Sequence, residues 1–363
     1  MRIPAVHLQQ QIAETEPRWR ALLDALFARS HYILGPEGAA FETEFAAFTG
    51  APHAVACGNG TDALTLALRA MEVRPGDEVV TTALSAPFTA VGIAAAGARL
   101  RFADVDPHTL QIDPASAARW ITPRTRALVP VHLYGQPAPL DRLQALGLPL
   151  LQDAAQAHGA RFRGRPLTSW SAFVTYSFYP TKNLGALGDG GAIAVRSARA
   201  AARLRSARDG GRLPGGMVAH AAGINSRLDE IQACYLRAFL ERLSGWNAAR
   251  ARIAALYDEL LRDCPGLTLI QRTRESVHHL YVIRARRRTA LRRALAAQGI
   301  GTGIHYPVPL HLNPAFADCG QARGALPTAE KAAREVLSLP LWPHLPVSQV
   351  EEVAAAVRRF YTR

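Results

Sequence analysis

Lysine is almost missing from this chain of 363 residues, although the chain is strongly basic. Of its 42 Lys and Arg residues, two are lysines, Lys182 and Lys331, which leaves 40 arginines. A chain with this bias uses arginine wherever a positive charge is sufficient. A lysine that is kept is expected where an amine must lose its proton and attack, as in imine formation with an aldehyde.

Cysteines are also few, and long apolar runs are missing. The four cysteines lack the spacing of a zinc site, a redox pair or a disulfide framework, which predicts no metal centre and a reducing, cytoplasmic location. No run approaches the roughly 20 apolar residues of a membrane span. The N-terminus lacks the apolar core of a signal peptide, so neither secretion nor membrane insertion is expected.

The net charge of +13 does not by itself predict a nucleic-acid partner. Basic residues are spread along the chain, and only Arg284 to Arg293 is dense. That stretch is typical of an amphipathic helix with a solvated face. We therefore expect no nucleic-acid binding.

The pattern up to about residue 225 predicts an α/β domain. After helical periodicity at 14–29 and 38–48, short apolar runs alternate with helix-like stretches, which favours crossover connections and a mostly parallel sheet between helices. The runs lie at 54–57, 78–82, 99–103, 126–133, 148–152, 172–178 and 191–195, and the intervening helices include 62–71, 87–96, 113–120 and 139–146.

The remainder predicts a smaller α+β domain. Helical stretches at 228–243 and 246–262 precede a strand at 277–285, a helix at 289–298, an extended loop at 302–320 and a helix at 349–361. We place the boundary near residue 240, with a large domain over 1–240 and a small domain over 241–363.

Three motifs carry candidate chemistry. In Cys57-Gly58-Asn59-Gly60-Thr61-Asp62, glycines before a helix suit a phosphate, although a plain strand-to-helix turn explains them equally well. In the second motif, Asp153 ends a buried-looking strand, where it either pairs with a cation or caps the next helix. The third is Tyr179-Pro180-Thr181-Lys182-Asn183-Leu184-Gly185, where a lysine in an apolar, glycine-rich segment would have a lowered pKa.

Together these motifs resemble the DegT/DnrJ/EryC1/StrS family of pyridoxal-phosphate (PLP) dependent sugar aminotransferases, which have fold type I. The resemblance extends from Tyr32-Ile33-Leu34-Gly35-Pro36 through Asn225-Ser226-Arg227 to Leu337-Ser338-Leu339-Pro340. It implies a large PLP-binding α/β/α domain and a smaller C-terminal domain.

The resemblance also implies roles for individual residues. Lys182 would hold PLP as a Schiff base and carry protons, and Asp153 would pair with the pyridine nitrogen. The other cofactor contacts would be Gln156 near the phenolic oxygen, Phe88 on the ring face, Gly60, Thr61 and Ser177 at the phosphate, and Asn225 at the phosphate of the neighbouring subunit of a homodimer. Substrate contacts would come from Tyr179, His305 and Tyr306, whereas a proline-stiffened surface loop is the alternative for the last two.

The implied reaction transfers an amino group from glutamate, through PLP and its pyridoxamine form (PMP), to a ketone on a nucleotide-linked sugar. The segment around Lys182 is most similar to enzymes that aminate C3 of a dTDP-3-keto-6-deoxyhexose. One departure is that 209–222 lacks the Lys-Tyr pair that many of them have there; Arg212 is a substitute contact for the diphosphate. A 4-keto, UDP-linked or cyclitol substrate therefore stays open, as does a non-catalytic sugar-nucleotide binding or regulatory protein. A dehydratase of this family would have histidine at the position of Lys182.

Overall fold

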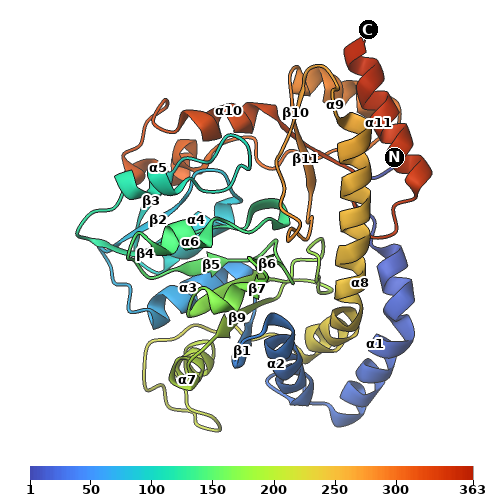
Figure 1. Cartoon of the computed structure of the whole chain (residues 1–363). Helices are drawn as coiled ribbons and strands as arrows, with labels where there is room; N and C mark the ends of the chain where they lie inside the picture. Colours follow the sequence, from blue (N-terminus) through green and yellow to red (C-terminus); the bar gives the residue numbers. More distant parts are fainter. Residues whose placement is uncertain (363) are drawn as a thin grey trace.

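One central sheet organises the computed structural model, which describes residues 1–362 (Figure 1). Strands β3-β2-β4 form one group and β5-β8-β9-β1 the other, and bridges from Leu128 to Leu150 and from Val131 to Asp153 join them between β4 and β5. Strand β9 is antiparallel to both of its neighbours, and the other pairings are parallel. This arrangement confirms the prediction of a mostly parallel sheet in an α/β fold, and solved structures described below share it.

The elements of the large part follow in chain order: α1 (Gln9–Arg29), α2 (Pro36–Thr49), β1 (His53–Cys57), α3 (Gly60–Ala70), β2 (Glu78–Thr82), α4 (Pro87–Ala95), β3 (Arg99–Ala103), α5 (Pro114–Arg119), β4 (Thr125–Val129), α6 (Leu140–Gln144), β5 (Leu151–Asp153), β6 (Arg161–Phe162), β7 (Arg165–Pro166), β8 (Phe173–Ser177), β9 (Gly191–Val195) and α7 (Ala198–Ala207). Then come α8 (Glu230–Leu261), β10 (Leu267–Leu269), β11 (Tyr281–Ala285), α9 (Arg288–Ala297), α10 (Pro327–Glu335), β12 (Val336–Leu339) and α11 (Val347–Thr362).

Alternate residues of the strands supply two apolar cores, one on each face of the sheet. Val55, Val79 and Ile193 belong to the core that α3, α4 and α10 cover. Their neighbours Ala54 and Val80 point to the other face and belong to the core that includes residues of α2, α5, α6 and α8. This alternation follows from the two-residue period of a strand.

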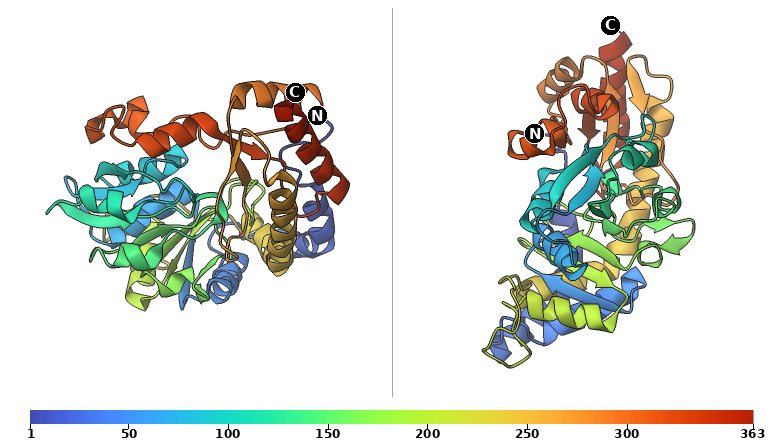
Figure 2. Two further views of the ribbon diagram at one scale, coloured as in Figure 1. Left: turned by 45° about the horizontal axis from the view of Figure 1, so that its top comes forward. Right: turned by 90° about the vertical axis from the view of Figure 1, so that its left-hand side faces the viewer.

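Helix α8 connects the large part to the C-terminal sheet β10-β11-β12. Its first half contributes Leu236 and Phe239 to a core of the large part, and its second half contributes Ile253 and Tyr257 to a third core with β11, β12, α9 and α11. At its beginning, Glu230 accepts hydrogen bonds from three backbone amides at the start of α2, which have no partners within that helix. The first residues of the chain also lie against the C-terminal part (Figure 2), where Ile3 bridges to Ile300.

Several elements differ from the prediction. The two helical stretches at 228–243 and 246–262 form the single helix α8, which continues through the exposed Gly245 because packing on both sides outweighs the low helix propensity of one glycine. The expected boundary near residue 240 falls inside this helix. Part of the loop expected at 302–320 contains two short 3₁₀ helices, Leu310–Leu312 and Pro314–Cys319, and the prediction missed α7, α10 and β12.

Candidate active site

The carboxyl ends of β1, β5 and β8 bring the three sequence motifs together. Asp153 is the last residue of β5, Ser177 is the last residue of β8, and both Ser177 and Cys57 pair with Gly191 at the beginning of β9. In an α/β sheet this edge is where ligands bind. A Cβ atom on Gly191 would lie 2.4 Å from the backbone of Asn59, so glycine permits the close approach of the first motif.

Lys182 projects from a tight turn after β8. Its backbone amide donates to the Tyr179 carbonyl at 2.8 Å, and the turn closes where the Ala186 amide donates to the Phe178 carbonyl at 2.7 Å. Gly185 fits there because a Cβ atom would lie 2.3 Å from the Pro180 oxygen. Burial lowers the pKa of the Lys182 amine to about 8, against the opposing effect of the Asp153 charge.

Asp153 is 4% exposed, and no arginine of residues 1–362 is among its partners. Its Oδ2 accepts a hydrogen bond from the Thr89 hydroxyl at 2.9 Å, and its Oδ1 accepts one from the Ala155 amide at 3.0 Å. Because the Thr89 hydroxyl donates its proton to Asp153, it can only accept from the Ser85 hydroxyl, which lies 3.1 Å away. Burial raises the pKa of Asp153, although these bonds and Lys182 act in the opposite direction.

The beginning of α3 offers a set of unoccupied donors. Asn59 caps the helix through the Asp62 amide at 2.8 Å, whereas the amides of Gly60 and Thr61, in the first turn, have no acceptor within the described chain. The Ser177 side chain lies against Gly60, because a Cβ atom on Gly60 would lie 2.6 Å from the Ser177 Cβ and 3.2 Å from its Oγ. Amides and hydroxyls at a helix N-terminus suit a phosphate group.

Three histidines surround Lys182. Burial, reinforced by the Lys182 charge, lowers the pKa of His158 to about 3, that of His305 to about 4 and that of His279 well below its usual value. His158 packs against the rings of Tyr176 and Phe178. All three imidazoles are therefore neutral near pH 7 and add no positive charge to the site.

The predicted substrate pair His305 and Tyr306 reaches this edge from the C-terminal part. The Gln156 amide nitrogen donates to the Tyr306 hydroxyl at 3.0 Å, and the Gln156 oxygen accepts from the Tyr134 backbone amide at 2.7 Å. The Nδ1 atom of His305 pairs with the Ser338 hydroxyl at 2.8 Å. The bond from Gln156 to Tyr306, and the position of His305 directly before Tyr306, place these three residues in one cluster.

Three other predicted residues have exposed side chains and do not join this cluster. Phe88, at the beginning of α4, is 65% exposed, and Tyr179 is 53% exposed. Asn225 is exposed as well, while the next residue, Ser226, bonds to Gly58 and Asp62 of the first motif. The predicted roles of these three residues stay predictions.

Arg212, the proposed diphosphate contact, is held by Asp209. Its Nη2 lies 2.6 Å from the Asp209 carboxylate, which also accepts from Arg227 at 2.7 Å. The pair of arginines thus shares one carboxylate and keeps a net positive charge beside Asn225, whose backbone bridges to Asp209.

Sequence reasoning missed Thr89, Ser226, Asn183 and His279. Ser226 follows the predicted Asn225, Thr89 follows the predicted Phe88 and Asn183 follows the lysine, so proximity to a predicted residue was the available signal. His279 had no such signal, because it is far from the motifs in sequence and reaches the site from the segment before β11.

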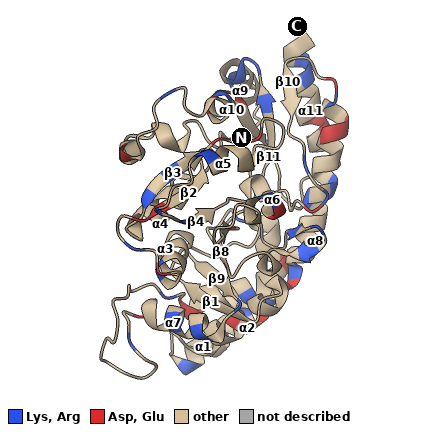
Figure 3. Cartoon of the chain, turned by 60° about the vertical axis from the view of Figure 1, so that its left-hand side comes forward, with Lys and Arg blue, Asp and Glu red and all other residues tan. Residues whose placement is uncertain are grey.

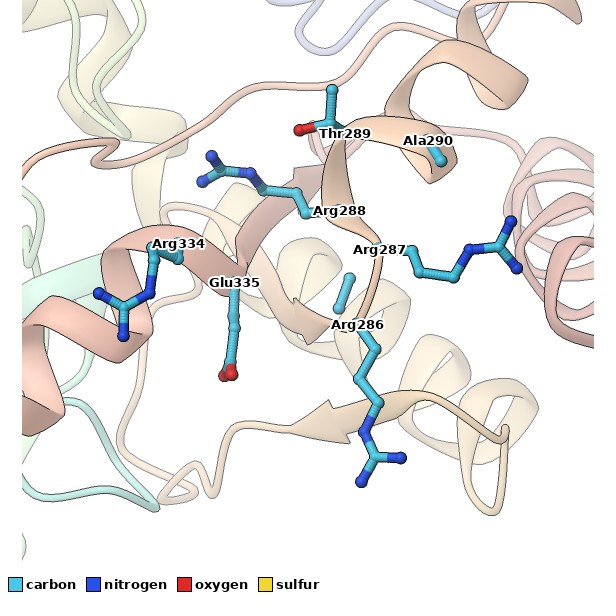
Figure 4. Close-up of a pocket in the computed structure, with 8 residues that line it drawn as sticks. Arg286, Arg287, Arg288, Thr289, Ala290, Arg334 and Glu335 are labelled. Atoms are coloured by element: carbon cyan, nitrogen blue, oxygen red, sulfur yellow. The ribbon is translucent and has the colours of Figure 1, made fainter.

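Other surfaces offer weaker candidates. A pocket of about 590 Å³ at the beginning of α9 is lined by Arg286, Arg287, Arg288, Arg334 and Glu335, but the side chains of Arg286 and Arg287 point in different directions (Figure 4). Basic residues also occur on many other elements (Figure 3).

Among residues 1–362, no group of three or more His, Cys, Asp or Glu side chains is arranged to hold a metal ion. No helix in that range combines the length and apolarity needed to cross a membrane. All four cysteines are buried and unpaired.

Comparison with known proteins gives consistent matches over the whole chain. Residues 14–358 match the model of the DegT/DnrJ/EryC1/StrS aminotransferase family. A dTDP-3-amino-3,4,6-trideoxy-alpha-D-glucose transaminase from Streptomyces venezuelae is 43% identical, covering 100% of this chain and 97% of the relative. A pleiotropic regulatory protein from Geobacillus stearothermophilus is 42% identical, covering 99% of both chains.

A solved structure is similar at the level of the backbone. The crystal structure of S. venezuelae DesV in complex with a ketimine intermediate superposes with a TM-score of 0.96 at 42% identity, covering 99% of both chains. The likeness therefore includes the C-terminal sheet as well as the central one.

Proposed function

Since the chain belongs to the DegT/DnrJ/EryC1/StrS aminotransferase family, we propose that this enzyme uses PLP to aminate a ketone on a nucleotide-linked sugar. The observation that carries the proposal is one half-buried amine, Lys182, and one buried carboxylate, Asp153, whose charges act on each other beside free amides at a helix N-terminus. Among the 42 Lys and Arg residues only Lys182 and Lys331 have the amine that PLP requires, and Lys331 is exposed.

The residues present fit PLP. Asp153 is buried, and within the described part of the chain Lys182 is the cation whose charge acts on it, as expected for a carboxylate that would meet a protonated ring nitrogen. Gly60, Thr61 and Ser177 supply unoccupied donors for the phosphate. Bound PLP would supply an electron-withdrawing ring that stabilises negative charge at the carbon being deprotonated.

The protein's own groups hold and move protons. Lys182, with a pKa of about 8, can exist as the free amine near neutral pH and serves as the base and then the acid at the reacting carbon. Thr89 and the Ala155 amide keep the Asp153 carboxylate oriented toward the ring. Gln156 and Tyr306 share a hydrogen bond at this edge of the sheet, and Phe88 would lie on the face of the bound ring.

We propose glutamate as the amino donor and C3 of a dTDP-linked 3-keto-6-deoxyhexose as the acceptor position. The similarity to a transaminase named for a dTDP-3-amino sugar supports this choice. A homodimer would place Asn225 and the Asp209-bound arginines at the neighbouring site, where their net positive charge suits a diphosphate. Exposed apolar side chains at Phe88, Leu213 and Met217 are consistent with a surface that a second subunit covers.

Absorption spectroscopy tests the cofactor assignment. Purified protein incubated with PLP should gain an absorption band in the visible range, and glutamate should bleach it. The band should survive gel filtration in the native chain and be lost after Lys182→Ala. A protein that binds no PLP would overturn the assignment and favour the non-catalytic alternative.

Single-turnover assays test the substrate. The pyridoxamine form should be consumed by a dTDP-3-keto-6-deoxyhexose and not by its 4-keto isomer or a UDP-linked sugar. Reaction with either of the last two alone would overturn the choice of C3 on a dTDP carrier, while leaving the aminotransferase itself in place.

A further inference from the structure

The residue that follows the candidate lysine is fixed more firmly than the lysine itself. Asn183 is 1% exposed, and its side-chain amide nitrogen donates to Asn247 Oδ1 at 2.8 Å and to the Val277 carbonyl at 2.9 Å. Its side-chain oxygen pairs with Nδ1 of His279 at 3.1 Å. These partners come from α8 and from the segment before β11, so two parts of the chain that are distant in sequence hold this one amide.

These contacts determine the tautomer of His279. The Val277 carbonyl can only accept, which fixes the nitrogen of the Asn183 amide on that side and its oxygen toward His279. Because that oxygen can only accept, Nδ1 of His279 must carry the proton. Burial and the charges of Lys182 and Arg250 hold the pKa of His279 well below its usual value, so the ring is neutral and Nε2 has no proton.

Asn247 connects Asn183 to the segment that contains Asp153. Its amide nitrogen donates to the His158 carbonyl at 2.8 Å, and His158 follows Asp153 by one short turn. Gly159 adopts a positive φ of 86°, and a Cβ atom there would lie 3.2 Å from the Asn247 nitrogen. The close approach of α8 to this turn therefore depends on a glycine, and Asn247 ties the Asp153 segment to the Lys182 segment.

We propose that Asn183, oriented by the Nδ1 proton of His279 and by Asn247, is the positioning residue that keeps the Lys182 amine in its half-buried place near Asp153. Asn183 acts through its neighbour, since both of its side-chain polar atoms already have partners. Lys182 has no side-chain hydrogen bond among residues 1–362, so its placement depends on where the backbone at 182 and 183 is held.

The consequence concerns the acidity of the amine. Burial is what lowers the pKa of Lys182, and Asp153 is the charge that opposes this effect; the imidazoles of His158, His279 and His305 face the same space as neutral groups. If the anchor at Asn183 is lost, the amine gains access to water and its pKa should rise toward that of an ordinary lysine. The importance of Lys182 rests on the proposed function, but its acidity can be measured without cofactor or sugar.

Competitive acetylation of the PLP-free protein measures that acidity directly. The protein is treated with trace acetic anhydride at pH values from 6 to 11, and mass spectrometry then measures the extent of acetylation of Lys182. Lys331, the other lysine of the chain, is exposed and serves as the internal reference. The variants are Asn183→Ala, His279→Gln, which places an amide near the Nε2 position, and His279→Asn, which keeps a donor near the Nδ1 position. Asn313→Ala is the matched control, because it removes an amide donor to a backbone carbonyl, that of Pro309, outside this network.

We expect the labelling midpoint of Lys182 to rise by about one pH unit in Asn183→Ala and His279→Gln, which makes the amine about tenfold less reactive near pH 7.5. In His279→Asn and Asn313→Ala, the labelling midpoint of Lys182 should be the same as in the native protein. Native titration of Lys182 in folded Asn183→Ala and His279→Gln would overturn the proposal, and so would an equal shift in both His279 variants. If Asn183→Ala shows no cooperative unfolding, that variant is not folded, and the comparison of His279→Gln with His279→Asn tests the proposal in its place. None of these results bears on whether the holoenzyme transaminates, which the spectral test decides separately.

Discussion

At the scale of single residues, the assignment of Lys182 makes a clear prediction. Lys182→Arg keeps a positive charge but cannot form an imine, since the guanidinium does not deprotonate. The rate of the glutamate half-reaction should fall by roughly 10³-fold or more, while thermal unfolding stays cooperative. Stopped-flow absorbance measures the rate, and turnover within a few fold of the native value would contradict the central role of this lysine.

Thr89 should act through Asp153. Thr89→Val is nearly isosteric but removes the hydrogen bond to the buried carboxylate, so the pKa of Asp153 should rise further. A hydrogen bond to a charged group contributes about 1.5–3 kcal/mol, which predicts a rate about 10- to 100-fold lower in the same half-reaction. Thr49→Val is a suitable control, because that buried hydroxyl bonds to the Phe45 carbonyl within α2, away from the sheet edge.

The lowered pKa of Lys182 also predicts a dependence of stability on pH. Between pH 8 and 10.5, the unfolded chain holds more protons on this amine than the folded chain, so the free energy of unfolding rises with pH across this window. Lys182→Met lacks the titrating group. The free energy of unfolding of the PLP-free native protein should therefore rise relative to that of this variant by on the order of 3 kcal/mol from pH 7.5 to pH 10.5. Urea unfolding at several pH values measures it, and a constant difference would show that the pKa of Lys182 is not lowered.

At the scale of secondary-structure elements, two helical glycines should respond in opposite ways to alanine. Gly245 lies exposed within α8, and a Cβ atom there would meet nothing within 4 Å. Gly245→Ala should stabilise the protein by about 0.5–1 kcal/mol. In α4, a Cβ atom on Gly92 would lie 2.8 Å from the Leu64 Cβ and 2.9 Å from the Thr61 carbonyl, so Gly92→Ala should destabilise. Thermal unfolding of both variants tests the pair, and the same sign for both would contradict this account of the packing.

The elements also show what the sequence could predict. Apolar runs with strand length located the central strands, and motif order located Asp153, Ser177 and Lys182 at one sheet edge. Helix α8 was predicted as two pieces, because Ser244 and Gly245 weaken the local helical pattern and only the cores on both sides reveal its continuity. His279 was not predictable, because its place beside Asn183 depends on how the C-terminal part packs, which no local pattern records.

At the scale of the whole molecule, the proposed homodimer can be tested by complementation. Lys182→Arg and Asn225→Ala should each be inactive or weak alone if Asn225 serves the neighbouring site. In a mixed dimer, one site carries both changes and the other carries none. Mixing the subunits at equal amounts and allowing exchange should therefore restore about a quarter of native activity, the statistical expectation for a twofold assembly. The absence of recovery in confirmed mixed dimers would show that each site is built from one chain.

The continuity of α8 limits how this protein can be recombined with its relatives. A chimera joined near residue 240 would have its junction inside a helix whose two halves enter different cores. Each residue inserted or deleted there turns everything beyond it by about 100° around the helix axis and moves it about 1.5 Å along that axis. Exchanges of the C-terminal part should therefore succeed only between parents whose α8 helices have equal length.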